Sequence, residues 1–346
     1  MLGSQCPSGG PPSPEPIEAS PQHVPSVAID FASISPPLLM NEEDVPPESG
    51  TVSSECREHS MPLDDQRVIL IALGDALQLG ADAAPAGPKG YANAFHLLST
   101  VFRACMAMSV RCVDGRVETL LALLRVACGV AARGPPQEEL PRTAAAFLGA
   151  LATSPHPPPA HSAAMRALHQ LAQDRSWWAR MTCLEFAQPL FFYSLPLLHA
   201  EPERAVQAEE FALKLMRDPR IEVRKEAASL LTGLMHCRAL TNEAETLRGL
   251  MRCCRSKELV ERHCGVLGLC SYVASRPYSL GPKLGDVLSE LSRHTTAPDP
   301  IPATIRNALA DFRRTHQDDW AKHREQLTEE ELDLLADLTS PPSYCA

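Results

Sequence analysis

An all-α fold built from stacked helix pairs is predicted by three features of the sequence. Ala and Leu are abundant while aromatic residues make up 5% of the 346 residues, a bias that favours helix over strand. Apolar residues recur with helical spacing in runs such as 68–79 and 92–110. Short breaks rich in Pro and Gly follow these runs, as at 134–136 and 154–159, so we expect helices joined by short loops.

The first 62 residues differ in composition from the rest of the chain. They contain twelve of the 32 prolines, together with many Ser and Glu residues and no sustained apolar period. Such a segment cannot bury enough apolar surface to fold, so we expect residues 1–62 to be disordered. The helical repeats are expected in residues 63–340, with a short tail at 341–346.

Internal repetition defines the kind of helical fold. Asp174 and Asp218 are separated by 44 residues, as are Arg180 and Arg224, and each Asp–Arg pair opens a helical run. Further arginines then fall into register at spacings of 38, 44, 38 and 44: Arg142, Arg180, Arg224, Arg262 and Arg306. Repeats of about 40–47 residues are typical of HEAT and armadillo units. The sequence therefore predicts a HEAT/armadillo-like helical-repeat solenoid.

The repeated residues suggest intramolecular roles. Each Asp is expected to cap the second helix of its pair, and each Arg to contact an Asp or helix-end carbonyls along the stack. The small residues that follow, such as Gly265, would let neighbouring helices approach closely. Trp177 and Trp178 resemble an aromatic platform, but at a helix start within a repeat we expect them to pack between helices.

Charge and cysteine usage exclude several classes of protein. A net charge of −10 argues against nucleic-acid binding through a basic face, and the short basic clusters at 252–257 and 313–316 are expected to be solvated. The N-terminus lacks the features of a secretory signal, and no apolar run has the ~20 residues of a membrane span. Cysteines inside apolar helical runs are expected to pack as free thiols of a cytosolic or nuclear protein: Cys105, Cys128, Cys183 and Cys270.

No catalytic motif was found, so we expect a protein that is not an enzyme and needs no cofactor. The one metal-like group is Cys253-Cys254 with His263-Cys264, whose spacing fits no zinc pattern because adjacent cysteines point apart. We therefore expect no metal. A thiol enzyme or metal protein built on Cys253, Cys254 and Cys264 remains an alternative.

The C-terminal end carries two signals. Thr328 followed by Glu331 is a capping box, which predicts a helix that ends before the prolines at 341 and 342. The last residues, Tyr344, Cys345 and Ala346, are either a frayed terminus or a docking peptide whose free carboxylate binds a basic pocket.

Four stretches resemble the C-terminal end of the large HEAT-repeat proteasome activators: 176–180, 222–228 with 231–234, 258–263 with 265–269, and 307–320. The resemblance is clear over 176–346, weaker over 63–175 and absent from 1–62; residues 176–340 overlap the family's bromodomain-like region. It implies a helical dome that caps the α-ring of the proteasome core particle, in nucleus and cytosol, and promotes ubiquitin-independent degradation. The family tail opens the gate, and its bromodomain-like region reads acetylated histones, which links it to DNA repair and spermatogenesis.

Three departures from the family pattern qualify these expectations. Cys345 replaces the penultimate Tyr, and a thiol lacks the stacking area and strong hydrogen bond of a phenol. Arg238-Ala239 replaces the Asn-Phe pair that reads acetyl-lysine, which argues against histone reading. The lysine-rich loop is shortened to 251–257, which weakens any nuclear-import signal. The alternative is a helical-repeat scaffold for other protein partners, without gate opening or acetyl-lysine reading.

Overall fold

The computed structural model describes Arg103, Cys128, residues 139–154 and residues 156–339, all within the second of two units of the chain, Met61–Ala346. Every regular element among these residues is a helix, so the predicted all-α fold is confirmed for this part of the chain. The predicted disordered segment 1–62, the apolar runs 68–79 and 92–110, and the tail 341–346 lie outside the described residues.

The helices are, in chain order, α5 (Glu139–Thr153), α6 (Pro158–Leu171), α7 (Trp177–Tyr193), α8 (Leu195–Ala200), α9 (Pro202–Leu215), α10 (Ile221–His236), α11 (Glu243–Cys254), α12 (Leu259–Ala274), α13 (Leu284–Ser292), α14 (Ile301–Thr315), α15 (Trp320–Arg324) and α16 (Glu329–Thr339). Across the described part of the chain, none of them has both the length and the apolar character that crossing a membrane requires.

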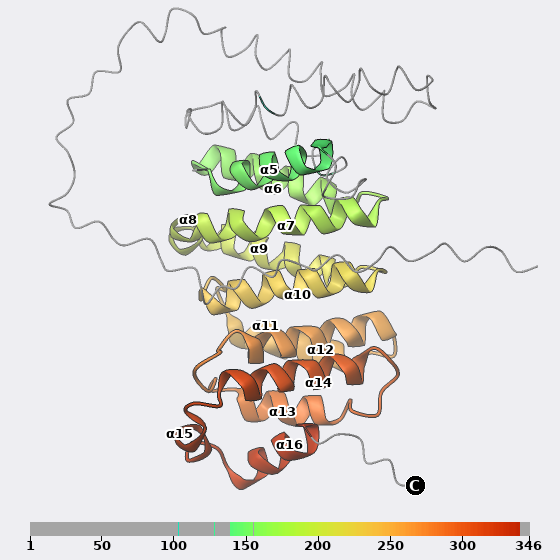
Figure 1. Cartoon of the computed structure of the whole chain (residues 1–346), viewed down its shortest axis with the longest axis vertical. Coiled ribbons are helices and arrows are strands. Elements are labelled where there is room, and N and C mark those ends of the chain that lie inside the picture. The colour runs from blue at the N-terminus through green and yellow to red at the C-terminus, as the bar shows by residue number, and fades with distance from the viewer. Residues whose placement is uncertain (1–102, 104–127, 129–138, 155, 340–346) are drawn as a thin grey trace, which may run out of the picture. The chain divides into compact units, whose positions relative to one another are not determined.

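The described helices form two rows that run along the stack (Figure 1). In the first row, α5, α7, α10, α12 and α14 pack against one another in that order. The second row contains α6, α9, α11 and α13, and each of these helices packs against a neighbour in the first row. Since successive pairs are added in the same way, this is the helical-repeat solenoid that the residue spacings predicted.

The core is one apolar cluster that continues through the stack. Its largest fully buried side chains come from different repeats and include Phe147, Phe191, Phe211 and Tyr272. In α10, the buried positions Val223, Ala227, Leu230 and Leu234 recur at helical spacing, so one face of the helix meets its neighbours while the other stays polar. Each pair thus depends on the adjacent pairs to cover its apolar face.

The predicted capping box is present at the start of α16. The Thr328 backbone N–H donates to Glu331 Oε2 at 2.8 Å, and the Glu331 N–H donates to Thr328 Oγ1 at 3.2 Å. These reciprocal bonds fix the point at which the last described helix begins.

Candidate functional site

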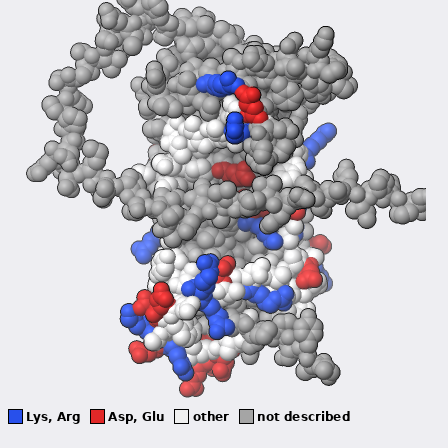
Figure 2. All heavy atoms as spheres, in the orientation of Figure 1, with Lys and Arg blue, Asp and Glu red and all other residues white. Residues whose placement is uncertain are grey.

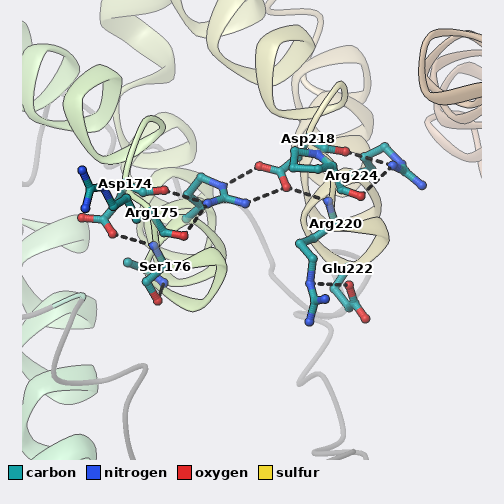
Figure 3. A network of polar contacts seen from close by, with 10 residues as sticks. Asp174, Arg175, Ser176, Asp218, Arg220, Glu222 and Arg224 are labelled. Carbon is teal, nitrogen blue, oxygen red and sulfur yellow. Dashed lines mark hydrogen bonds and ion pairs between the residues drawn. The ribbon is translucent and has the colours of Figure 1, made fainter. Parts of the chain in front are cut away.

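The repeated arginines and aspartates connect one repeat to the next (Figure 3). Asp218, in the loop before α10, accepts two bonds from Arg180 of α7, at 2.5 Å from Nε and 2.8 Å from Nη2. Arg180 Nη1 also donates to the Asp174 carbonyl oxygen at 2.7 Å, at the end of its own loop. Both side chains are almost fully buried. The pair is therefore an internal support of the stack.

In the next repeat, the equivalent arginine, Arg224, contacts a histidine. Arg224 Nη1 donates to the Asp218 carbonyl oxygen at 2.9 Å, as Arg180 does to its own loop, but Arg224 Nε donates to His263 Nδ1 at 3.0 Å. Since arginine is always the donor, Nδ1 of His263 must be the acceptor and the ring proton must be on Nε2. Nε2 then donates to Thr304 Oγ1, which lies 3.1 Å away on α14.

The predicted arginine ladder is confirmed for part of the register. Arg262 Nε donates to the Ser256 carbonyl oxygen at 2.9 Å, which matches the loop contacts of Arg180 and Arg224. The prediction is wrong for Arg306, whose side chain is exposed and makes no hydrogen bond to a described residue. For Arg142 it stays a prediction, because the loop that precedes this arginine lies outside the described residues.

The prediction that the aspartates cap the second helices is also wrong. Asp174 Oδ1 accepts the Ser176 N–H at 2.8 Å, and Asp218 Oδ1 accepts the Arg220 N–H at the same distance. These bonds close turns in the loops, because each Asp lies two residues before the N-cap position. The cap of α7 is instead Ser176, whose hydroxyl accepts from the Ala179 N–H.

A second set of polar contacts joins the repeats at the opposite ends of the helices. His199 Nε2 lies 3.2 Å from the Cys237 carbonyl oxygen, and His236 Nδ1 lies 2.9 Å from the Ser275 carbonyl oxygen. The two residue separations are 38 and 39, close to the repeat length. The stack is thus tied at both ends of its helices, although only the arginine end was predicted from the sequence.

We expect the stability of the stack to fall in acid because of His263. Burial and the adjacent Arg224 lower the pKa of His263 to about 4, from an ordinary 6.5. Below pH 6.5 the unfolded chain therefore takes up a proton that the folded chain excludes, so stability is full above 6.5 and is lost as the pH falls toward 4. The loss should reach roughly 3 kcal/mol near pH 4.

The measurement is urea denaturation between about pH 7.5 and 4, compared with His263→Gln, whose amide can accept from Arg224 and donate to Thr304. The variant should show a flatter profile over this range. Glu226, whose pKa burial raises to about 7, titrates in both proteins and cancels in the difference. Equal pH profiles for the two proteins would contradict the role of His263.

The two tryptophans at the start of α7 behave differently. Trp177 is half-buried against the core, and the Arg220 guanidinium of the next repeat lies over its ring at 4.7 Å. Trp178 stacks on Trp177 with ring centroids 3.8 Å apart but keeps 38% of its surface exposed. Packing between helices is thus confirmed for Trp177 and wrong for Trp178, which faces outward.

Arg238 and Ala239, which occupy the position of the family's acetyl-lysine-reading pair, terminate α10. The Arg238 N–H donates to the Met235 carbonyl oxygen and the Ala239 N–H to that of Leu234, which is a Schellman motif. Arg238 adopts a left-handed φ of 54°, with an exposed side chain, and Ala239 is 3% exposed. The Ala239 methyl group therefore packs into the core and is not available to a ligand.

We expect Arg238→Gly to stabilise the protein by about 0.5–1 kcal/mol, because a residue with a Cβ is strained in the left-handed region and glycine is not. Chemical denaturation of the two proteins measures this difference. The adjacent Cys237 has an ordinary φ of −78°, so Cys237→Gly should be destabilising instead. The same sign for both substitutions would contradict the backbone argument.

A recess of about 510 Å³ lies between α9, α11 and the loop that follows Arg238-Ala239. Arg217 donates to both carboxylate oxygens of Glu261 there, at 2.8 and 2.9 Å, and to Cys253 Sγ at 3.3 Å. Thr246 Oγ1 donates to Glu209 Oε1 at 2.6 Å. The lining residues come from α9, α11, the start of α12 and the loops that connect these helices, and sequence reasoning did not identify this recess.

The cysteine cluster considered as a metal or thiol site is divided between different environments. Cys254 and Cys264 are buried, whereas Cys253 is half-buried beside Arg217. Burial raises the pKa of Cys264 to about 12 and also raises that of Cys253, which disfavours the reactive thiolate. The His263 ring is hydrogen-bonded on both nitrogens. Among the described residues, no three potential ligands gather to hold a metal ion.

The basic clusters are interspersed with acidic side chains, as the red and blue spheres near α13 to α16 show (Figure 2). Arg255 pairs with Glu290 at 2.9 Å, and Arg314 pairs with Asp311 at 3.1 Å. The described region therefore carries mixed charge on the face shown, rather than one basic surface.

Comparison with known proteins identifies the C-terminal region. Residues 259–346 match the family model "Proteasome activator complex subunit 4-like, C-terminal". This region is therefore similar to the C-terminal part of that family. The chain is also 32% identical over 274 residues to proteasome activator complex subunit 4 of Bos taurus and of Homo sapiens, a match that spans 72% of the chain. It covers 15% of those relatives, so the chain corresponds to a small part of their length.

The resemblance inferred from the four sequence stretches is therefore confirmed. A solved HEAT-like repeat protein from Thermococcus onnurineus NA1 is similar with a TM-score of 0.31 and 12% identity, covering 81% of this chain and 99% of that one. The fold assignment does not depend on this likeness, because the helix pairs and their packing establish it. Tyr344, Cys345 and Ala346 lie within the matched residues but outside the described ones.

Proposed function

We propose that this chain is a proteasome-associated regulator that docks on the end of the proteasome core particle and promotes ubiquitin-independent degradation of peptides or proteins. One observation carries the proposal: the match to the proteasome activator family continues through the last residue of the chain. The docking element is the tail Tyr344-Cys345-Ala346, whose terminal carboxylate would bind a basic group between α-ring subunits. In this proposal the protein acts by binding rather than by catalysis, in nucleus and cytosol.

The described stack suits this role physically. Buried pairs such as Arg180–Asp218 hold each repeat to the next, so a partner would meet a firmly connected body. Docking by a short tail then involves little loss of conformational freedom in the body of the protein. Any part that this chain takes in the family's acetylated-histone turnover, DNA repair and spermatogenesis would follow from the degradation that it promotes.

The test is co-sedimentation of the intact chain with purified core particle, together with hydrolysis of a fluorogenic peptide. We expect binding that is lost when residues 341–346 are removed. Cys345→Tyr should strengthen binding and increase peptide hydrolysis, because a phenol adds stacking area and a stronger hydrogen bond. Arg314→Ala, at an exposed ion pair, is the matched control and should bind as the wild type does.

If neither the intact chain nor Cys345→Tyr binds core particle, the proposal fails. A helical-repeat scaffold for other protein partners is then the better assignment. It is favoured by Cys345 in the tail and by the buried methyl group of Ala239, which leaves no ring at the position of the acetyl-lysine-reading pair.

A further inference from the structure

The recess between α9 and α11 has the size and shape to receive a long side chain. Helix α9 packs mainly against α10, and α11 mainly against α12, and the space of about 510 Å³ lies between these two second-row helices. Its wall is open at Gly249, where a Cβ would meet nothing closer than Arg252 Nη2 at 3.8 Å. Leu213 and Leu250 add apolar surface to the wall. The recess therefore offers room together with a surface for aliphatic carbons.

The charged groups that line the recess are not evenly matched. Arg217 donates to both carboxylate oxygens of Glu261, so these two charges compensate each other. Arg252 lies 3.6 Å from Glu245 and pairs with that carboxylate. Glu209 is the remaining charged residue in the lining. The recess as a whole thus carries one negative charge more than it carries positive charges.

Glu209 has a neutral partner but no counter-ion in the part of the chain that the structure describes. Its Oε1 accepts from the Thr246 hydroxyl at 2.6 Å. Burial raises the pKa of Glu209; the Thr246 bond opposes this effect and the neighbouring Glu210 adds to it. A carboxylate that is partly withdrawn from water in this way is stabilised by a cation that fits beside it.

The ammonium group of lysine is the cation that suits this geometry best. Arginine binds a carboxylate most strongly when both oxygens accept side by side, and one oxygen of Glu209 is already bonded to Thr246. Lysine carries a compact charge on a flexible aliphatic stem, which can lie along the side chains of Leu213 and Leu250. Acetylation of the lysine would remove its charge and leave Glu209 without compensation.

We propose that this recess binds the unmodified lysine side chain of a partner protein, with the ammonium group at Glu209 and the stem against Leu213 and Leu250. This binding goes beyond docking on the core particle. It uses residues of α9 and α11 and none of the tail 341–346, so each of the two activities can fail while the other remains.

The test is an NMR titration of the intact chain, observed at the methyl groups of Leu213, Leu250 and Thr246. The probe is the peptide Gly-Ser-Lys-Ser-Gly with both ends blocked, and the control probe is the same peptide with an acetylated lysine. The unmodified peptide should shift these methyl signals in a saturable way. The acetylated peptide should bind at least about tenfold more weakly, since a hydrogen bond between charged groups is replaced by a neutral contact.

Two variants locate the effect within the recess. Glu209→Gln removes the charge but keeps an oxygen for the Thr246 hydroxyl, so it should weaken binding of the unmodified peptide by at least about tenfold as well. Glu210→Gln is the matched control, because this neighbouring carboxylate is exposed and does not line the recess. It should bind the peptide as the wild type does.

The absence of a saturable shift with the unmodified peptide would overturn the proposal, and so would equal affinities for the two peptides. Equal losses for Glu209→Gln and Glu210→Gln would also overturn it, because they would indicate a general attraction to acidic surface. Circular dichroism shows whether Glu209→Gln is folded. If it is not, the comparison of the two peptides on the wild type decides.

Discussion

Gly265→Ala is expected to destabilise the protein by about 3 kcal/mol or more, an overpacking effect at the upper end of the usual range. A Cβ at this position would lie 2.5 Å from the Cys254 backbone nitrogen, 2.6 Å from the Leu250 carbonyl oxygen and 2.8 Å from Cys254 Sγ. Two of these three atoms belong to the backbone of α11, so no side-chain rotation relieves the contact. Helices α11 and α12 would have to move apart.

Separating α11 from α12 would disturb more than one pair, because α12 also packs against α10 and α14. The loss should appear as a lower midpoint in urea denaturation and as weaker exchange protection in both helices. Cys254→Ala in the Gly265→Ala background removes the sulfur contact but leaves both backbone contacts. It should therefore restore little of the stability.

Gly249→Ala on α11 is the matched control. A Cβ there would meet nothing closer than an arginine nitrogen at 3.8 Å, and alanine favours helix over glycine by about 0.5–1 kcal/mol. This variant should be as stable as the wild type or more so. Comparable losses for the two glycines would show that the close approach of α11 and α12 is not what Gly265 provides.

The arginine ladder shows how far the sequence determines the contacts. The spacing of Asp174, Arg180, Asp218 and Arg224 predicted the loop contacts, because each arginine reaches carbonyls six residues back in its own repeat. The spacing did not predict which side chain each arginine contacts in the next repeat. Six residues before Arg262 the chain has Ser256 instead of an aspartate, so Arg224 finds no carboxylate there and bonds to His263. That exchange depends on how two helices pack.

Other contacts between helices could not be predicted from the sequence for the same reason. The recess combines Glu209 and Arg217 of one repeat with Thr246 and Glu261 of the next, and the packing of the repeats brings these residues together. The contact between the His316 and His323 rings depends on a turn that returns α15 to α14. Helix periodicity gives the buried face of each helix, but it does not give the contacts between faces of different helices.

Asp218→Ala is expected to cost about 3–5 kcal/mol, since it leaves the Arg180 guanidinium buried without its carboxylate. The pair is well shielded, with side-chain exposures of 10% for Arg180 and 4% for Asp218. The substitution also removes the acceptor for the Arg220 N–H, which closes the loop before α10. Helices α7 and α10 would lose their polar connection at this end.

Asp218→Asn separates the effect of the lost charge from that of the lost turn hydrogen bond, and Arg314→Ala is the exposed control. Asp218→Asn keeps an oxygen for the Arg220 N–H and removes the charge, so its cost should be clearly smaller than that of Asp218→Ala. Arg314→Ala breaks an ion pair at 3.1 Å whose side chains are 74% and 65% exposed, and should cost less than about 1 kcal/mol.

Urea denaturation, monitored by circular dichroism, ranks the three variants by their free energies of unfolding. Similar losses for Asp218→Ala and Arg314→Ala would mean that the buried pair contributes no more than a surface one. The stack would then be held by its apolar core alone. The predicted order of stability losses requires instead that the Arg180–Asp218 pair stabilises the repeats because it is shielded from water.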